Sequence, residues 1–226
     1  MSTVTPLVAE DAARAQAHQA DRLSQRTHRI AIGVLGLLLP LLVWLFAGRR
    51  PTVGLDRPWE RLDSISAYFY TGGAGVFTGV LIALSLFLTT YPGYKGFIWD
   101  RVVGVTGGIA AAVVALVPTR PPKPLPIPAW WTNTLGVIHY VSAVVLFTSF
   151  ILFSLWLFRK SSVPKGAKRP FEKVLRDQVC LVCGLVMVGA VLWAGRAGFT
   201  DGPIFVPEAI AVEAFAISWL TKATSR

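Results

Sequence analysis

Residues 63–88, DSISAYFYTGGAGVFTGVLIALSLFL, decide the fold class of this chain. The stretch begins with polar and aromatic residues, passes through four glycines and ends in an apolar run. A helix that crosses a bilayer needs about 20 predominantly apolar residues. We therefore predict a transmembrane helix whose polar end has a role other than contact with lipid.

Five more apolar segments surround this one, and the composition agrees with a membrane protein. The chain has 226 residues, of which 54% are hydrophobic and 15% are charged, whereas about a quarter of the residues in soluble domains are charged. We predict an all-α polytopic protein with six transmembrane helices in one domain, residues 30–221. A polar segment, 1–29, precedes this domain, and a short tail, 222–226, follows it. The predicted spans are residues 30–46, 68–89, 101–117, 134–158, 177–194 and 204–221.

The basic residues indicate how the chain is oriented. The net charge is +10, but the charges lie in short loops between apolar runs, which argues for topology signals and against a nucleic-acid partner. Most of the 22 Lys and Arg residues fall on the side of the N-terminus, so we expect both termini to be cytoplasmic. We expect a multi-pass protein of the bacterial inner (plasma) membrane. The basic loop, residues 159–176, is expected to contact anionic lipid headgroups. The oligomeric state stays open.

Two sequential spans carry small residues at four-residue spacing, which allows helix backbones to approach closely in lipid. The two sets are Gly75, Gly79 and Ala83 in the second span, and Gly104, Gly108 and Ala112 in the third. The link between these spans is short, which makes them antiparallel neighbours. We predict that the two stripes face each other.

Polar residues at membrane depth are costly, so each one suggests a function. They gather at the predicted outer ends of the second, fourth and sixth spans. We predict an outward-facing polar pocket between these helices that binds a small or lipid-like ligand, with no cofactor and no metal. The expected ligand-binding residues are Ser64, Ser66, Tyr68, Tyr70, His139, Ser142 and Glu208.

The same residues leave an enzymatic alternative open, although the balance favours no catalysis. His139 is suited to be a general base, but a hydrogen-bonded structural histidine fits as well. Glu208 lies in the first turn of a helix, where a carboxylate also suits the dipole. Asp63 and Ser64 are candidates for catalysis or for a helix N-cap. The alternative function is a membrane-embedded lipid or amide hydrolase that uses His139 with Asp63 and Ser64, or with Glu208. A transporter and a structural partner subunit are further alternatives.

Two other features leave their roles open. Glu213 lies near the middle of the last span and needs a partner or a water-filled cavity, or else stays protonated. Cys180 and Cys183 form a CxxC pair, but they lie near the cytoplasmic end, where thiols are kept reduced. We interpret the two cysteines as packing residues.

Three segments resemble a bacterial family of uncharacterised six-helix membrane proteins. They are SISAYFYTGGAGVFTGVL at 64–81, IHYVSAVVLF at 138–147 and PEAIAVEAFAISWLTK at 207–222. The resemblance implies a six-helix fold and no particular activity. In that family the position of Glu213 is usually apolar or aromatic, which makes Glu213 peculiar to this chain.

A looser similarity links the chain to the CREST group of membrane hydrolases, which includes alkaline ceramidases. That group uses a Ser and an Asp on an early helix, with several histidines that hold zinc. Asp63, Ser64 and His139 are similar to this pattern. The chain departs from it because His139 is the only histidine in a predicted span, whereas such a zinc site uses three.

Overall fold

The computed structural model describes residues 4–48, 60–93, 98–160 and 170–224, and within them it is helical, without strands. The most hydrophobic stretches form the helices, as the sequence predicts. The elements are α1 (Val4–Ala47), η2 (Ser66–Tyr70), α2 (Ala74–Thr89), α3 (Ile98–Leu116), α4 (Asn133–Leu155), η3 (Leu157–Arg159), α5 (Phe171–Phe199) and α6 (Phe205–Ala223). Trp59, most of the first loop, and residues 161–169 of the basic loop lie outside the described residues.

Four stretches of helix are long and apolar enough to cross a membrane. They are Leu23–Ala47, Ile98–Leu116, Asn133–Arg159 and Phe171–Phe199. Helix α2 has 16 residues, and α6 carries Glu208, Glu213 and Lys222 within its 19 residues. The prediction of an all-helical fold is therefore confirmed, and the four long apolar helices are consistent with a membrane protein.

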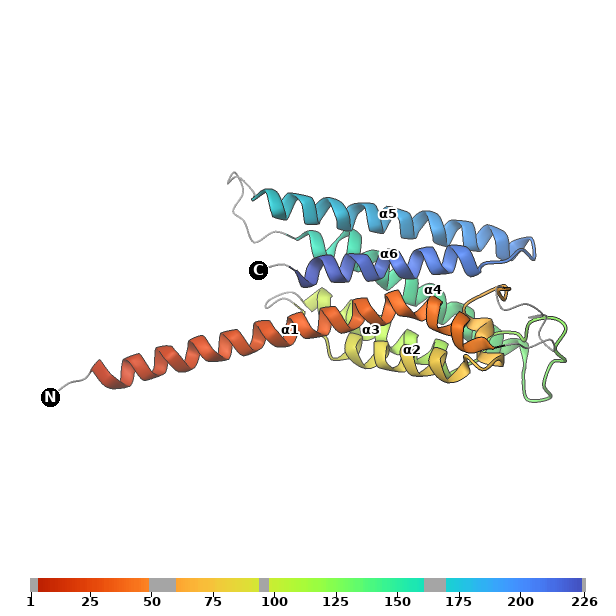
Figure 1. The fold of residues 1–226 in the computed structure, drawn as a ribbon, viewed down its shortest axis with the longest axis horizontal. Coiled ribbons are helices and arrows are strands. Elements are labelled where there is room, and N and C mark those ends of the chain that lie inside the picture. The colour runs from red at the N-terminus through yellow and green to blue at the C-terminus, as the bar shows by residue number, and fades with distance from the viewer. Residues whose placement is uncertain (1–3, 49–59, 94–97, 161–169, 225–226) are drawn as a thin grey trace.

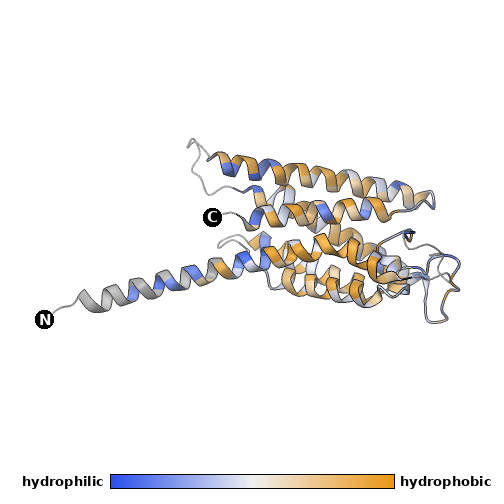
Figure 2. Ribbon diagram, viewed as in Figure 1, coloured by the Kyte–Doolittle hydropathy of each residue, from blue (hydrophilic) through white to orange (hydrophobic). Residues whose placement is uncertain are grey.

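The six helices pack as a bundle whose two ends differ (Figure 1). Helix α6 lies between α1 and α5, and α3 lies between α2 and α4. The N-terminal half of α1 projects beyond the bundle, and both termini lie toward the same end. Figure 2 shows hydrophilic residues on the coloured turns of the projecting part of α1 and mostly hydrophobic residues along the bundle.

The helix bounds differ from two of the predicted spans, each for a local reason. The second span does not begin as an α-helix at residue 68, because a 3-10 turn and a bend precede α2. Thr71 fixes the bend, since its hydroxyl donates to Tyr68 O at 2.8 Å and accepts from Gly73 N at 3.0 Å. The fifth helix is longer than 177–194 at both ends. Gly195 and Gly198, which follow the predicted span 177–194, continue the helix, because a glycine costs only about 1 kcal/mol relative to alanine in a helix interior.

An aromatic layer fills the core toward the end of the bundle where the chain terminates. Phe150 of α4 stacks on Phe215 of α6 with ring centroids 3.5 Å apart. Trp219 contacts the rings of Phe153 at 5.0 Å and Tyr91 at 5.1 Å. All five side chains are buried. Because this layer joins α4, α6 and the link after α2, it fixes these elements relative to one another.

The two predicted small-residue stripes do not face each other. Helices α2 and α3 are neighbours, and a Cβ added to Gly104 or Gly108 would lie 2.9 Å from Leu88 O or 2.8 Å from Ser85 O of α2. A Cβ at Gly75 or Gly79 would meet no atom of the described residues within 4 Å. The α3 stripe therefore packs on the last turns of α2, whereas the α2 stripe faces away from the bundle.

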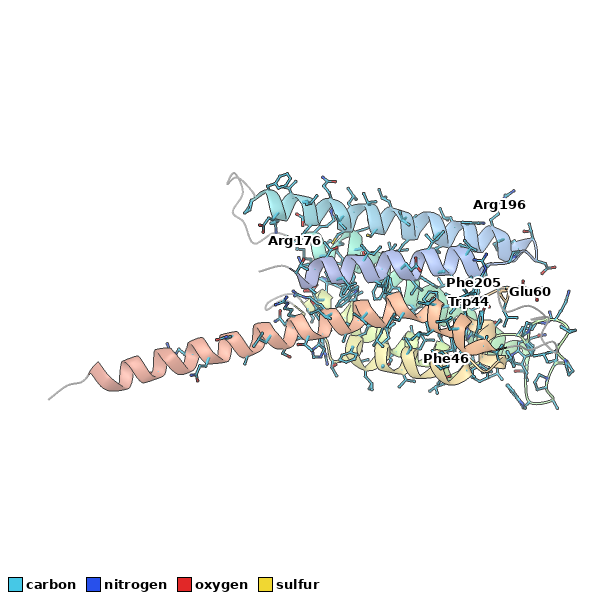
Figure 3. The ribbon with its side chains drawn as sticks, viewed as in Figure 1. Trp44, Phe46, Glu60, Arg176, Arg196 and Phe205 are labelled. Atoms are coloured by element: carbon cyan, nitrogen blue, oxygen red, sulfur yellow. The ribbon has the colours of Figure 1, made fainter. Side chains whose placement is uncertain are left out.

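Charged side chains mark both ends of the bundle. Arg176 and Arg196 lie near opposite ends of α5 (Figure 3). At 1.5 Å per residue they are about 30 Å apart along the helix, which matches the hydrocarbon thickness of a bilayer. At the end near the termini, Lys222 Nζ donates to Phe158 O at 2.8 Å, and Arg29 Nε donates to the Tyr91 hydroxyl at 3.3 Å.

Candidate ligand site

A cavity of about 340 Å³ opens at the end of the bundle where α5 ends and α6 begins. Residues of α4, α5 and the start of α6 line it, together with the segment that leads into η2. The polar groups of the lining are Ser64, Ser66, Thr119, His139, Tyr140 and Glu208. This volume is within the range of pockets that bind small molecules.

The walls of this cavity differ from those expected from the sequence. Helices α4 and α6 contribute, as expected, but α5 takes the place of α2. The α5 residues Val191, Ala194, Gly195 and Gly198 recur at helical spacing and form one face. Small residues on that face leave the space open. The second predicted span, 68–89, contributes no lining residue, whereas Ser64 and Ser66, which precede it, line the cavity.

His139 is the best-defined polar group of the site. It is 5% exposed and lies about 9 Å along α4 from the start of the helix. Its Nδ1 lies 2.5 Å from Val117 O, and its Nε2 lies 3.0 Å from Ser66 Oγ. A carbonyl oxygen can only accept, so Nδ1 carries a proton, and the Nε2 of the neutral ring accepts from the Ser66 hydroxyl.

The proline-rich segment after α3 explains why His139 has this tautomer. The last carbonyls of a helix lack partners within it, and Pro118 has no N–H with which to continue α3. Three consecutive carbonyls are instead satisfied by side chains. Val117 O accepts from His139, Pro118 O from Trp131 Nε1 at 3.3 Å, and Thr119 O from the Tyr70 hydroxyl at 2.7 Å.

The first turn of α6 holds the segment that carries Ser66. Asp63 O accepts from Ile204 N at 2.6 Å and from Phe205 N at 2.7 Å. Glu208 Oε2 accepts from Ile65 N at 2.7 Å. Glu208 thus lies in the first turn of its helix, as predicted, but its carboxylate bonds to a distant segment. Ser64 Oγ accepts from Ala67 N at 3.0 Å and caps the η2 turn.

The remainder of the cavity is apolar. Phe147, Val144 and Val191 line it away from His139. A smaller void of about 40 Å³ continues inward from Ser66 and Glu208, and apolar residues such as Phe77 and Leu146 surround most of it. The site therefore combines one polar end with an apolar wall.

Four residues predicted to be part of the site lie outside the cavity lining. The Tyr68 side chain is fully buried, and its hydroxyl accepts from Leu62 N at 3.3 Å. The Tyr70 hydroxyl donates to Thr119 O at 2.7 Å. Ser142 is half-buried on α4, and the side chain of Asp63 is exposed.

Sequence reasoning missed three features of the site. It did not identify the α5 wall, the exposed Tyr140 at the cavity, or the pairing of His139 with Ser66 rather than with Ser64. The helical spacing of small residues in 191–198 was the available signal for α5. No sequence pattern indicated that Val117 O would fix the histidine ring.

The remaining candidates lie away from the cavity. Cys180 and Cys183 are buried free thiols in α5, and Cys180 Sγ lies 4.0 Å from Ser218 O. Glu213 is exposed on α6. Within the described part of the chain, no three His, Cys, Asp or Glu side chains gather in a way that would hold a metal ion.

The chain matches no protein-family model, and no match was found among curated proteins or solved structures.

Proposed function

We propose that the chain is a six-span protein of the bacterial inner membrane with both termini in the cytoplasm. The four long apolar helices support membrane insertion, and α2 and α6 supply the two further crossings. Six crossings place both termini on one side, which agrees with their position in Figure 1. The basic residues favour the cytoplasm for that side. In this orientation the cavity opens toward the outside.

Reporter fusions test this topology. Green fluorescent protein fused after Arg226 fluoresces only in the cytoplasm, and alkaline phosphatase is active only outside. We expect a fluorescent C-terminal fusion and an inactive phosphatase fusion at the same site. A phosphatase fusion in the proline-rich segment, after Lys123, should be active. The opposite pattern would overturn the proposed orientation.

Within this topology, the cavity binds a small amphipathic ligand. The observation that carries the proposal is the cavity itself, with polar groups of Ser66, His139 and Glu208 at one end and an apolar wall at the other. A hydrogen-bonding headgroup fits the polar end, and an acyl or alkyl chain fits between α4 and α5. Burial of that chain stabilises the complex by about 0.8 kcal/mol per CH₂ group.

The core below the cavity favours binding over transport. A transporter needs a polar path that continues through the protein. Apart from Ser66 and Glu208, the residues that line the smaller void inward of the cavity are apolar, and one of them, Phe150, stacks on Phe215. A ligand that enters from the outside therefore finds no polar path that continues inward from the cavity.

A cavity-filling variant tests ligand binding. Ala143 lines the cavity, so Ala143→Trp should fill it. Val141 lies two residues away on α4, is 52% exposed and faces away from the site, so Val141→Trp is the matched control. We expect a defined amphiphile to be retained, at about one per chain, by the wild type and by Val141→Trp after extensive detergent washing. Mass spectrometry of the extracted lipids measures how much amphiphile each protein retains.

The result for Ala143→Trp decides the proposal. Loss of that amphiphile from a variant that remains folded supports the cavity as its site. An identical lipid content in all three proteins would contradict the proposal.

The basic loop, residues 159–176, is proposed to contact anionic headgroups at the cytoplasmic surface. The described residues on its flanks include Lys160, whose Nζ lies 4.6 Å from the centroid of the Trp156 ring and 3.9 Å from Asp100 Oδ1. This arrangement suits the headgroup layer, where aromatic and basic side chains gather. Sedimentation with vesicles that contain or lack phosphatidylglycerol, using a peptide of this loop, measures the contact.

A further inference from the structure

We propose that Ser66 is a nucleophile and His139 its general base, and that the pair cleaves a carboxylic ester or amide of an amphipathic substrate. This inference rests on the proposed function, because the substrate occupies the same cavity. It goes beyond binding by assigning a reaction to two hydrogen-bonded side chains. The nucleophile is Ser66 rather than Ser64.

The geometry of the pair is that of an activated hydroxyl. Ser66 Oγ lies 3.0 Å from His139 Nε2, which is within the reach required between a nucleophile and its base. The proton on Nδ1 is held by Val117 O at 2.5 Å, so the lone pair of Nε2 faces the hydroxyl. The ring therefore has the tautomer needed to accept the Ser66 proton.

The protein holds both partners from separate elements. His139 belongs to α4, and the hydrogen bond of its ring to Val117 O at the end of α3 sets the position of the ring. Ser66 begins η2, and the residue before it is held by Glu208 through the Ile65 N–H bond at 2.7 Å. Glu208 is accordingly a positioning residue, since its contact is with the backbone next to the nucleophile.

A second serine pair in the molecule shows what a purely structural hydroxyl looks like. Ser154 Oγ donates to Ser218 Oγ at 2.7 Å, and Ser218 Oγ donates to Phe215 O at 2.8 Å. Both side chains are 0% exposed. Ser66 differs because it lines the open cavity together with its base. A bound carbonyl group can therefore approach Ser66, whereas nothing can approach Ser154.

The reaction proceeds in two balanced steps. Ser66 Oγ attacks the carbonyl carbon of the substrate while His139 Nε2 takes the hydroxyl proton. The bond to the leaving alcohol or amine then breaks, and that group takes the proton from Nε2, which leaves an acyl ester on Ser66. Water, activated by the same nitrogen, hydrolyses this ester and releases a carboxylic acid. No oxidant or reductant takes part.

In a serine–histidine–aspartate triad a carboxylate orients the histidine, whereas here the neutral carbonyl of Val117 has that place. Val117 O orients the ring and accepts its proton, but it stabilises the imidazolium less than a negative charge would. We therefore expect slow turnover. This makes covalent labelling a more sensitive measurement than product release.

The test uses the full chain in detergent micelles and an alkyl fluorophosphonate probe, which reacts with activated serines. We expect labelling of the wild type at Ser66, located by mass spectrometry of the peptides. Ser66→Ala should lose the label. Ser142→Ala, which removes a hydroxyl of α4 outside the cavity lining, should keep it. His139→Gln should slow labelling about 100-fold or more, because general bases contribute at least this much.

The outcomes separate this inference from ligand binding. If the wild type retains its amphiphile in the cavity but takes no label, or if the label lies on another residue, the catalytic assignment is wrong and the binding proposal stands. Equal labelling rates in the wild type and His139→Gln would also overturn it. Because the peptide analysis uses the wild type, the test holds even where a variant fails to fold.

Discussion

Helices α2 and α3 carry the same spacing of small residues, yet only α3 uses it for packing. At Gly104 and Gly108 the backbone of α2 comes so close that a Cβ would lie within 3 Å of a carbonyl oxygen. At Gly75 and Gly79 a Cβ would meet no described atom within 4 Å. The spacing of glycines therefore identifies a groove but does not identify what fills it.

The difference arises because α2 buries a face of larger side chains. Its buried residues are Phe77, Leu81, Leu84, Ser85 and Leu88. Their contacts with the core contribute more dispersion energy than a glycine face can. Helix α3 has no comparable row of large residues on the side that meets α2, so its glycines admit the α2 backbone. Substitutions at the two stripes test this explanation in graded steps.

Gly108→Ala should have the largest effect. Its Cβ would lie 2.5 Å from Thr89 Cγ2, 2.8 Å from Ser85 O and 2.9 Å from Thr89 N. Two of these atoms are backbone atoms, so α2 and α3 must move apart. We expect a loss of about 2 kcal/mol, since overpacking costs 1–3 kcal/mol. This corresponds to a fall of about 4–8 °C in the thermal midpoint of unfolding in detergent.

Circular dichroism at the helix band measures this midpoint. Gly189→Ala is a matched control, because a Cβ at Gly189 would meet no described atom within 4 Å. A Gly108→Ala midpoint equal to that of the wild type would mean that α3 does not rest on α2 at this position.

Gly104→Ala should have a smaller effect of the same sign. The Cβ would lie 2.9 Å from Leu88 O, but the next side chain, Phe153, is 3.8 Å away. To relieve one clash with one carbonyl, α2 and α3 need to move apart by less than at Gly108. We expect a loss of about 1 kcal/mol, again measured as the thermal midpoint. A loss greater than that of Gly108→Ala would reverse the predicted order of closeness along α3.

The helices of the fold were predictable because hydrophobicity alone marks segments that suit a bilayer. The long runs in α1, α3, α4 and α5 were each found from sequence. The broken start of the second span was not, because it depends on the Thr71 hydrogen bonds and on Gly73, whose Cβ would lie 2.8 Å from Val43 O of α1. Such contacts are set by tertiary packing rather than by local propensity.

Of the predicted site residues, only Ser64, Ser66, His139 and Glu208 line the cavity, and its α5 wall was not predicted. Ser66, His139 and Glu208 stood out because polar groups at membrane depth are costly. The bond of His139 to Ser66 and the bond of Glu208 to Ile65 N depend on which face of each helix turns inward, and α4 carries polar residues on more than one face. The α5 wall was missed because Gly195 and Gly198 lie beyond the predicted fifth span, 177–194.

Gly33→Ala extends the comparison to the contact of α1 with α6. A Cβ there would lie 2.6 Å from Leu220 Cγ but 3.1 Å from the nearest backbone atom, Ala216 O. The side chain of Leu220 is half-buried and can change rotamer. We expect a loss below about 1 kcal/mol, the usual cost of an off-rotamer side chain. A second variant, Leu220→Ala with Gly33→Ala, should remove most of the clash, and a double-variant cycle on the midpoint measures the coupling.

Gly79→Ala should have the smallest effect, and its sign is the sharpest test of the comparison. The added methyl group points away from the bundle into open space. Alanine lowers the cost of helix formation by up to about 1 kcal/mol relative to glycine, so the thermal midpoint should stay unchanged or rise. If α2 faces lipid at this position, the thermal midpoint of Gly79→Ala does not depend on the protein concentration. A fall in the midpoint that grows as the protein is diluted in detergent would instead show that a second chain packs against Gly75 and Gly79. The open stripe of α2 would then serve contact between chains, as the stripe of α3 serves contact within one.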